Sequence, residues 1–301
     1  MTTKMPTLRP LFLGIACAIL ALVGTPSLHV GAASVNGTSS KNHLLRPGDH
    51  LERLRWAGMT RTYIVHVPTG SITANRPLIL VYHGSGNTAA GTIAITDFEQ
   101  VADRVGDIVV FMQGYRDTWD EQAGSSYAVK AHIDDVGFTR AALRALAALT
   151  AYNVDRVALT GFSNGAEMVQ TLGCRIASSI HLIVPVEGEI LSAISPGCAP
   201  SRPLRVYEIH GTADVSVPYG GGTFQGDLGP ISVLSARATA ARWAHLDGCP
   251  SGPRTMTVKF ITLTRYAPCS DGVSVTLRTI IGGTHWWPSN IGELVTSALG
   301  H

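Results

Sequence analysis

The sequence predicts an α/β fold, in which a mostly parallel sheet carries helices on both faces. Short apolar runs typical of buried strands alternate with helix-period segments along most of the 301 residues. A G-x-S-x-G sequence, residues 161–165, stands where one such run gives way to a helical pattern. Several residues with reactive side chains directly follow the runs, and ligands in such sheets bind outside the carboxyl ends of the strands.

The expected elements follow one another in α/β order. Residues 60–67 alternate in polarity and are rich in β-branched side chains, which is typical of a strand. Residues 77–82 and 107–112 are continuous apolar runs, which indicate strands buried on both faces. Residues 34–57 are polar and predict an irregular lead-in. The other expected elements are helices over 97–105, 131–150, 231–246 and 291–299, a helix from Ala166, and strands at 157–159, 181–186, 204–209, 256–264 and 273–280.

Composition favours one large globular domain over residues 34–301. The chain is 45% hydrophobic and 15% charged, which supports a sizeable core and disfavours disorder. Its 23 basic residues include Lys4 and Arg9, so the remainder has 21 basic and 21 acidic residues and no net charge. We therefore expect neither nucleic acid nor an anionic membrane surface as a partner. The oligomeric state is not predicted.

Residues 1–33 have the pattern of a signal peptide for export. Two basic residues precede an apolar run over 11–24, and small residues follow at 31–33. The run is shorter than the roughly 20 residues that a membrane span needs. Cys17 lies inside the run and not after it, which disfavours a lipid anchor. We expect a secreted or periplasmic protein without a stable membrane span.

Removal of this leader leaves four cysteines, Cys174, Cys198, Cys249 and Cys269. An even number in an exported protein predicts two disulfides, for which three connectivities exist. The sequential pairs Cys174–Cys198 and Cys249–Cys269 are favoured because they close short loops, and buried free thiols are the alternative. No C-x-x-C is present, which disfavours a zinc ribbon or a redox role.

The G-x-S-x-G sequence predicts a nucleophile elbow centred on Ser163. In such an elbow a tight strand-to-helix turn strains the serine backbone and presents its hydroxyl outward. Gly161 and Gly165 suit the turn because the strand and helix backbones crowd it. The amides at the helix N-terminus favour developing negative charge. A plain glycine-serine loop is the alternative interpretation.

Serine needs a base, and the base needs an orienting group. Asp214 and His285 each follow an expected strand, and the order Ser163, Asp214, His285 is that of α/β-hydrolases. Asp214 would fix the tautomer of His285, which would take the serine proton. Asp214 could instead cap a turn. The competing acids are Glu187, Glu189 and Asp227, and we expect His83 and His210 to have structural roles only.

The oxyanion of such a reaction needs two main-chain N–H donors. We expect one from Asn164, after the nucleophile, and one from Ser85, after the strand at 77–82. Residues 84–89 also fit a loose G-x-G-x-x-A dinucleotide pattern, but the next strand ends at Met112-Gln113 without an acid for a ribose. No P-loop, no H-E-x-x-H and no metal spacing of histidines is present. We expect no cofactor and no metal.

Four aromatic residues stand near the expected site in sequence: Tyr115, Trp119, Trp286 and Trp287. They could line an acyl or aromatic pocket, or they could serve ordinary loop packing.

Several motifs together resemble the secreted polyhydroxybutyrate depolymerase and feruloyl esterase family. They are HGSG at 83–86, VDRVALTGFSNGAEM at 154–168, IHGTADVSVPYGGG at 209–222 and GGTHWWP at 282–288. DDVGF at 134–138, and Trp243 ahead of Gly248-Cys249, agree as well. The resemblance implies an α/β-hydrolase fold, a triad of Ser163, Asp214 and His285, oxyanion donors at Ser85 and Asn164, and sequential disulfides.

The chain departs from that family in two ways. It shows no linker with a separate polymer-binding domain, and Asn164 stands where small residues are frequent. The expected function is a serine esterase that acts on feruloyl, acetyl or other short-chain esters, small or carbohydrate-linked, through an acyl-enzyme. The alternatives are a depolymerase of polyhydroxybutyrate oligomers and a catalytically silent binding protein with the same fold.

Overall fold

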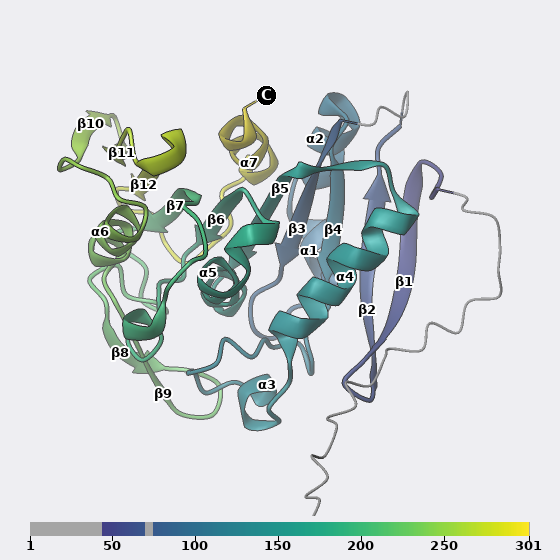
Figure 1. The fold of residues 1–301 in the computed structure, drawn as a ribbon. Helices are drawn as coiled ribbons and strands as arrows, with labels where there is room; N and C mark the ends of the chain where they lie inside the picture. Colours follow the sequence, from purple (N-terminus) through teal and green to yellow (C-terminus); the bar gives the residue numbers. More distant parts are fainter. Residues whose placement is uncertain (1–43, 70–74, 301) are drawn as a thin grey trace, which may run out of the picture. The chain divides into compact units, whose positions relative to one another are not determined.

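The central sheet has ten strands in the order β1-β2-β4-β3-β5-β6-β7-β12-β11-β10 (Figure 1). The computed structural model describes residues 44–69 and 75–300, so the expected signal segment and Cys17 lie outside the described residues. The strands of this sheet are β1 Gly48–Trp56, β2 Met59–Val67, β3 Arg76–Tyr82, β4 Ile108–Met112, β5 Tyr152–Phe162, β6 Leu182–Val186, β7 Arg205–Gly211, β10 Arg254–Val258, β11 Ile261–Tyr266 and β12 Val275–Ile280. A separate hairpin contains β8 Gly222–Gln225 and β9 Pro230–Val233.

The middle of the sheet is parallel, and its two edges are antiparallel. Strands β4, β3, β5, β6, β7 and β12 pair in parallel, whereas β1–β2 and β10–β11 add antiparallel pairs at either edge. This is the predicted α/β arrangement. The carboxyl ends of the parallel strands share one edge of the sheet, and the segments after β3, β5, β7 and β12 therefore meet there.

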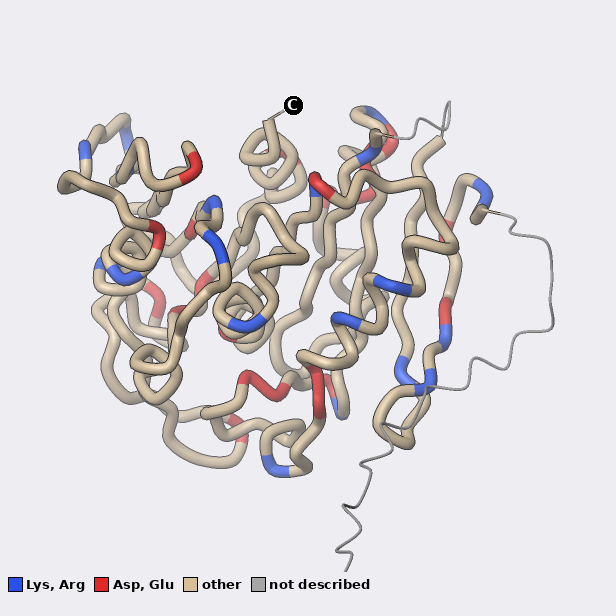
Figure 2. The backbone as a smooth tube through the Cα atoms, viewed as in Figure 1, with Lys and Arg blue, Asp and Glu red and all other residues tan. Residues whose placement is uncertain are grey.

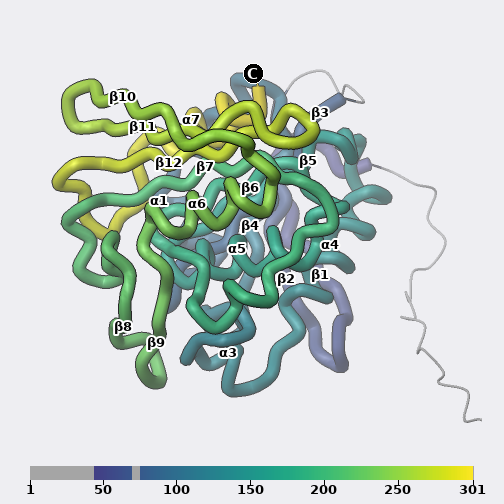
Figure 3. The backbone as a smooth tube through the Cα atoms, turned by 60° about the vertical axis from the view of Figure 1, so that its left-hand side comes forward, coloured from purple at the N-terminus to yellow at the C-terminus, as the bar shows by residue number. Residues whose placement is uncertain are grey.

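Helices cover both faces of the sheet (Figures 1 and 3). They are α1 Ala89–Ile95, α2 Phe98–Val105, α3 Tyr127–Lys130, α4 Asp135–Leu149, α5 Asn164–Ile176, α6 Ala236–Leu246 and α7 Ile291–Leu299, with short 3-10 helices at Ala177–Ser179, Ser195–Gly197 and Ser270–Gly272. The buried strand β3 shows why two cores form. Leu78 and Leu80 belong to the core under α4, α5 and α6, whereas Ile79 and Val81 face the core under α1, α2 and α7.

The lead-in and the helix expected over 231–246 differ from prediction. The lead-in contains strand β1, which the polar sequence disguised because it is an edge strand with alternating exposed charges. It pairs with β2 through a turn at Ala57 and Gly58, both at positive φ. The helix begins only at Ala236, after a Ser235 cap, because residues 230–233 pair with β8 as strand β9.

Other elements also differ from prediction. The strand expected over 256–264 is two strands, since Lys259 at φ 52° turns the chain between β10 and β11. Helix α4 begins at Asp135, where the Asp134 side chain accepts from the Gly137 N–H, and not at residue 131. Helix α1 follows the Thr88 cap and was not expected. Basic and acidic residues are interspersed over the described chain (Figure 2).

Candidate active site

Ser163 occupies a strained turn between β5 and α5. Its backbone lies at φ 54° and ψ −124°, which a residue with a side chain adopts only under constraint. A Cβ on Gly161 would collide with the main chain of Gly165, and a Cβ on Gly165 would collide with the carbonyl oxygens of Tyr82 and His83. Glycine is therefore required at both positions, and the turn has the geometry of a nucleophile elbow.

Two main-chain N–H groups near the elbow are available for an anion. Asn164 is the first residue of α5, and Ser85 follows β3. Neither N–H has a hydrogen-bond acceptor among residues 44–69 and 75–300, and both residues line the cavity beside Ser163. The Ser85 hydroxyl donates to Asp227 Oδ2 at 2.6 Å. N–H groups at a helix N-terminus and without an acceptor are able to bind an oxyanion.

Asp214 and His285 lie at the same edge of the sheet, after the neighbouring strands β7 and β12. Asp214 Oδ2 and His285 Nδ1 are 2.7 Å apart, and Asp214 Oδ1 accepts from the N–H groups of Ser216 and Val217. Burial alone would raise the pKa of Asp214, but hydrogen bonds from His210 and His285 outweigh it and hold this pKa well below its usual range. Asp214 is therefore an ionised partner for the imidazole.

The Ser163 hydroxyl makes no hydrogen bond to another described residue. The His285 ring lies beside the elbow, 4.6 Å from the ring of Phe162 between centroids. Hydrogen bonds between a nucleophile and its base are commonly long without substrate and shorten in the reacting complex.

The competing acids have other partners. Glu187 accepts from the Gly211 N–H, and burial raises its pKa to about 8. Glu189 Oε1 lies 2.6 Å from His210 Nδ1. Asp227 accepts from Ser85. None of these three acids has a described hydrogen bond to His285, whereas Asp214 does.

The two structural histidines hold loops, as the sequence indicates. His83 Nδ1 bonds the Gly84 carbonyl oxygen, and His83 Nε2 accepts from the Gly114 N–H. His210 Nε2 bonds the Val217 carbonyl oxygen, which lies in the loop of Asp214. Burial opposes the charge on His210, but Asp214, Glu189 and Glu187 outweigh it and raise its pKa to about 11. A buried imidazolium thus stands behind Asp214.

The cavity beside Ser163 encloses about 360 Å³. We name it the Ser163 cavity. The β8–β9 hairpin supplies several of its lining residues, which are Ser85, Ser126, Ser163, Asn164, Glu167, Val215, Ser216, Val217, Phe224, Gln225, Gly226, Asp227 and Ile231. Burial raises the pKa of Glu167 to about 7.

None of the four aromatic residues that could line a pocket or serve loop packing is among the lining residues of this cavity. Trp119 is 0% exposed and packs inside the core, and Trp287 is buried against Phe162. Trp286 is 63% exposed and Tyr115 is half-buried, but neither lines the Ser163 cavity. The apolar wall comes instead from Phe224, Ile231 and their neighbours. Phe224 and Ile231 belong to the β8–β9 hairpin, whose second strand overlaps the helix expected over 231–246.

Within residues 44–69 and 75–300, two groups of side chains have the spacing of metal ligands. In one, Glu187, Asp214 and His285 offer atoms within 4.8 Å of one another, but hydrogen bonds already engage them. In the other, Asp49 and His66 are cross-strand neighbours facing Glu99 on α2, and His66 Nδ1 bonds Asp49 Oδ1 at 2.7 Å. Neither group suggests a role for a metal in the chemistry of Ser163.

Disulfides join Cys174 to Cys198 and Cys249 to Cys269. This is the sequential pairing that the sequence favours. The first ties the elbow helix α5 to the loop before β7, and the second joins the end of α6 to the segment before β12.

The fold is that of α/β-hydrolases. The solved structures that resemble the chain include acetyl xylan esterase from Aspergillus awamori, with a TM-score of 0.57 and 14% identity over 83% of this chain and 99% of that chain. They also include the CE1 ferulic acid esterase of Anaeromyces mucronatus, with a TM-score of 0.56 and 10% identity over 87% of this chain and 94% of that chain. At these identities the likeness concerns the fold.

Proteins that are similar to the chain in sequence include named esterases. Feruloyl esterase B of Piromyces equi is 31% identical over 230 residues, which are 75% of this chain and 42% of the relative. Putative esterase NocK of Nocardia uniformis subsp. tsuyamanensis is 26% identical over 77% of this chain and 72% of the relative. The chain thus spans less than half the length of feruloyl esterase B. No protein-family model matches it. The chain is thus similar in sequence to proteins named esterases, and it shares its fold with solved esterases.

Proposed function

We propose that this protein is a serine carboxylic-ester hydrolase with Ser163 as nucleophile, His285 as base and Asp214 as the orienting acid. The observation that carries the proposal is the 2.7 Å contact between Asp214 and His285 at the sheet edge where the strained Ser163 turn lies. Asp214 and His285 are 71 residues apart in sequence, and their contact near the Ser163 turn supports a shared role in the proposed reaction.

In the proposed reaction, His285 Nε2 accepts the Ser163 proton while Ser163 Oγ attacks the ester carbonyl carbon. The carbonyl oxygen becomes an oxyanion, which the N–H groups of Ser85 and Asn164 bind. The intermediate then expels the alcohol, which takes the proton from His285 and leaves an acyl-enzyme. A water molecule, deprotonated by His285, releases the acid and restores Ser163.

A burst experiment tests the proposal. Mixing enzyme with p-nitrophenyl acetate should release up to one equivalent of p-nitrophenol per site rapidly, where deacylation is the slower step. A fluorophosphonate should label Ser163, as mass spectrometry of the labelled peptide would show. Absence of both turnover and labelling would contradict the proposal and favour the silent binding protein.

The acyl group fits a small cavity of mixed polarity. Volumes of roughly 300–1,000 Å³ are usual for small-molecule sites, and the Ser163 cavity lies at the lower end. Its Phe224 and Ile231 side suits an apolar acyl body. We propose a hydroxycinnamoyl or short-chain ester, in line with the names of the relatives, with a 3-hydroxyacyl ester as the alternative. A panel of methyl ferulate, acetylated xylan and hydroxybutyrate oligomers tests these, and preference for the last would support the depolymerase alternative.

We also propose that the protein is exported. The expected signal segment over 1–33 and the two disulfides support this, because disulfides persist in oxidising compartments. None of the described helices is long and apolar enough to cross a membrane. Expression with the leader, followed by N-terminal sequencing of protein from the medium or periplasm, tests the proposal. Retention of the intact leader on cytoplasmic protein would contradict it.

A further inference from the structure

Trp119 lies between the two segments that carry the proposed oxyanion donors. Its indole Nε1–H donates to the His83 carbonyl oxygen at 2.8 Å, two residues before Ser85. Its main-chain N–H donates to Asn164 Oδ1, also at 2.8 Å. One fully buried residue therefore holds both sides of the oxyanion hole.

The indole ring packs against the end of β3. Its centroid is 4.9 Å from those of Tyr82 and His83. The start of α5 also lies directly against the end of β3, since a Cβ on Gly165 would collide with the carbonyl oxygens there. The contacts leave little freedom for the distance between the two donor segments.

Asn164 is held at both ends of its side-chain amide. Besides the bond from Trp119, its Nδ2 donates to Glu121 Oε2 at 3.0 Å. Burial, followed by the neighbouring Glu167, raises the pKa of Glu121 well above its ordinary value. The same short segment, 119–121, thus supplies both partners of Asn164, which explains why an amide suits this position.

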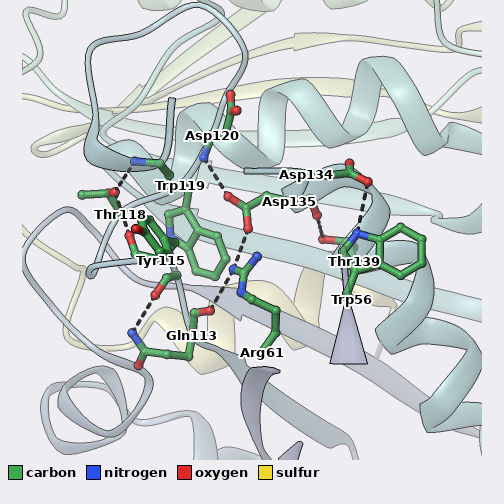
Figure 4. A network of polar contacts seen from close by, with 12 residues as sticks. Trp56, Arg61, Gln113, Tyr115, Thr118, Trp119, Asp120, Asp134, Asp135 and Thr139 are labelled. Carbon is green, nitrogen blue, oxygen red and sulfur yellow. Dashed lines mark hydrogen bonds and ion pairs between the residues drawn. The ribbon is translucent and has the colours of Figure 1, made fainter. Parts of the chain in front are cut away.

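A buried ion pair fixes both ends of the loop that carries Trp119 (Figure 4). Arg61 donates to Asp135 Oδ1 at 2.6 Å and to the Gln113 carbonyl oxygen at 3.2 Å. Asp135 Oδ2 accepts from the Asp120 N–H at 2.8 Å. Gln113 and Asp120 bracket the loop, so strand β2 and helix α4 together determine where Trp119 lies.

We propose that Trp119 is a positioning residue, whose two N–H groups set the separation of the Ser85 and Asn164 main-chain donors. The proposal rests on the proposed esterase function. Oxyanion donors lie about 2.7–3.1 Å from the position that the oxyanion will occupy. The carbonyl oxygen of the bound substrate, before reaction, occupies a different position. A displaced donor therefore weakens transition-state binding more than substrate binding, and kcat falls while KM changes little.

Trp119→Phe tests this, because it keeps an aromatic ring and the main-chain N–H and removes the indole donor to His83. It also removes buried ring volume, for which the control variant below makes the same change. We expect kcat for p-nitrophenyl acetate to fall roughly 10- to 100-fold, with KM within about twofold, since a displaced donor should matter less than a deleted one. The Ki of a trifluoromethyl ketone, which forms a tetrahedral oxyanion on serine, should rise in parallel with the loss of kcat/KM.

Trp243→Phe is the matched control. Trp243 is also fully buried, and its Nε1–H donates to Gln170 at 2.7 Å, away from the oxyanion donors. This variant should lose comparable stability in urea unfolding and keep kcat. Unchanged kcat in Trp119→Phe, or equal losses of kcat in the two variants, would overturn the proposal.

Asn164→Ala provides a second route if Trp119→Phe does not fold. It keeps the main-chain donor and removes the side chain that Trp119 and Glu121 hold, so we expect the same loss of kcat with little change in KM. Wild-type kinetics in this variant would overturn the positioning role. A wild-type protein without burst or fluorophosphonate labelling would instead refute the esterase function, and this inference with it.

Discussion

The two halves of the candidate site are organised by different forces. The serine half, around Ser163, Asn164 and Trp119, is held by hydrogen bonds from main-chain and indole N–H groups. The histidine half, around Asp214 and His285, is held by charges, with the imidazolium of His210 behind an ionised Asp214. The serine half therefore depends on shape, and the histidine half depends on protonation.

This division follows from the proposed chemistry. An oxyanion exists only briefly, so its donors must already be in place, and rigid neutral hydrogen bonds achieve this. A base that gains a proton needs a permanent negative neighbour, and an ionised Asp214 provides it. Variants in both halves should consequently lose kcat, but for different physical reasons.

Ser163→Ala should have the largest effect, because it removes the nucleophile and leaves the rest of the serine half intact. We expect kcat to fall by roughly 10⁶-fold, as for other serine hydrolases that lose their nucleophile. Steady-state assays with p-nitrophenyl acetate measure this, and circular dichroism checks the fold. Ser178→Ala, at an exposed serine in the 3-10 helix after α5, should behave as wild type. Substantial turnover by Ser163→Ala would exclude the acyl-enzyme mechanism.

Asp214→Asn should have the next largest effect, about 10⁴-fold in kcat, because an amide favours the wrong imidazole tautomer and cannot stabilise the imidazolium. The loss should appear in kcat with KM little changed, and fluorophosphonate labelling should slow in proportion.

Glu187→Gln and Glu189→Gln are the matched controls for the acid. Both residues are buried within the same cluster, yet neither is hydrogen-bonded to His285. Each should keep kcat to within about tenfold, an indirect effect through the loop of Asp214. A larger loss in either than in Asp214→Asn would transfer the orienting role to that glutamate.

The sequence predicted the parts of the site that depend on local pattern. The glycines around Ser163 and the strand ends before Asp214 and His285 are readable from neighbouring residues, and the structure joins this aspartate and histidine. The role of Trp119 was not predictable, because its partners His83 and Asn164 lie 36 and 45 residues away. The wall formed by Phe224 and Ile231 was missed because residues 231–233 pair with a short strand that periodicity alone does not reveal.

Removal of either disulfide should reduce stability and leave the chemistry intact. The sequence separations of 24 and 20 residues predict about 3 kcal/mol each from the entropy of the unfolded chain. Double alanine variants of Cys174 and Cys198, or of Cys249 and Cys269, should show this in urea unfolding while kcat at 25 °C stays near wild type. If loss of the Cys174–Cys198 bond lowered kcat more than tenfold, the geometry of the serine half would depend on that link as well.

The last effect concerns Glu187 and the pH dependence of stability. Its folded-state pKa of about 8 exceeds the unfolded value of about 4.3, so between these values the folded protein holds a proton that the unfolded chain has lost. The free energy of unfolding should therefore fall as pH rises through this window, by at most about 1.4 kcal/mol per pH unit from this residue.

Glu187→Gln carries no such proton, whereas His210 is present in both proteins. Urea unfolding at pH 5, 6, 7 and 8 should show the variant gaining stability relative to wild type as pH rises. Parallel curves would mean that Glu187 is ionised in the folded protein and that the histidine half holds one more negative charge than we infer.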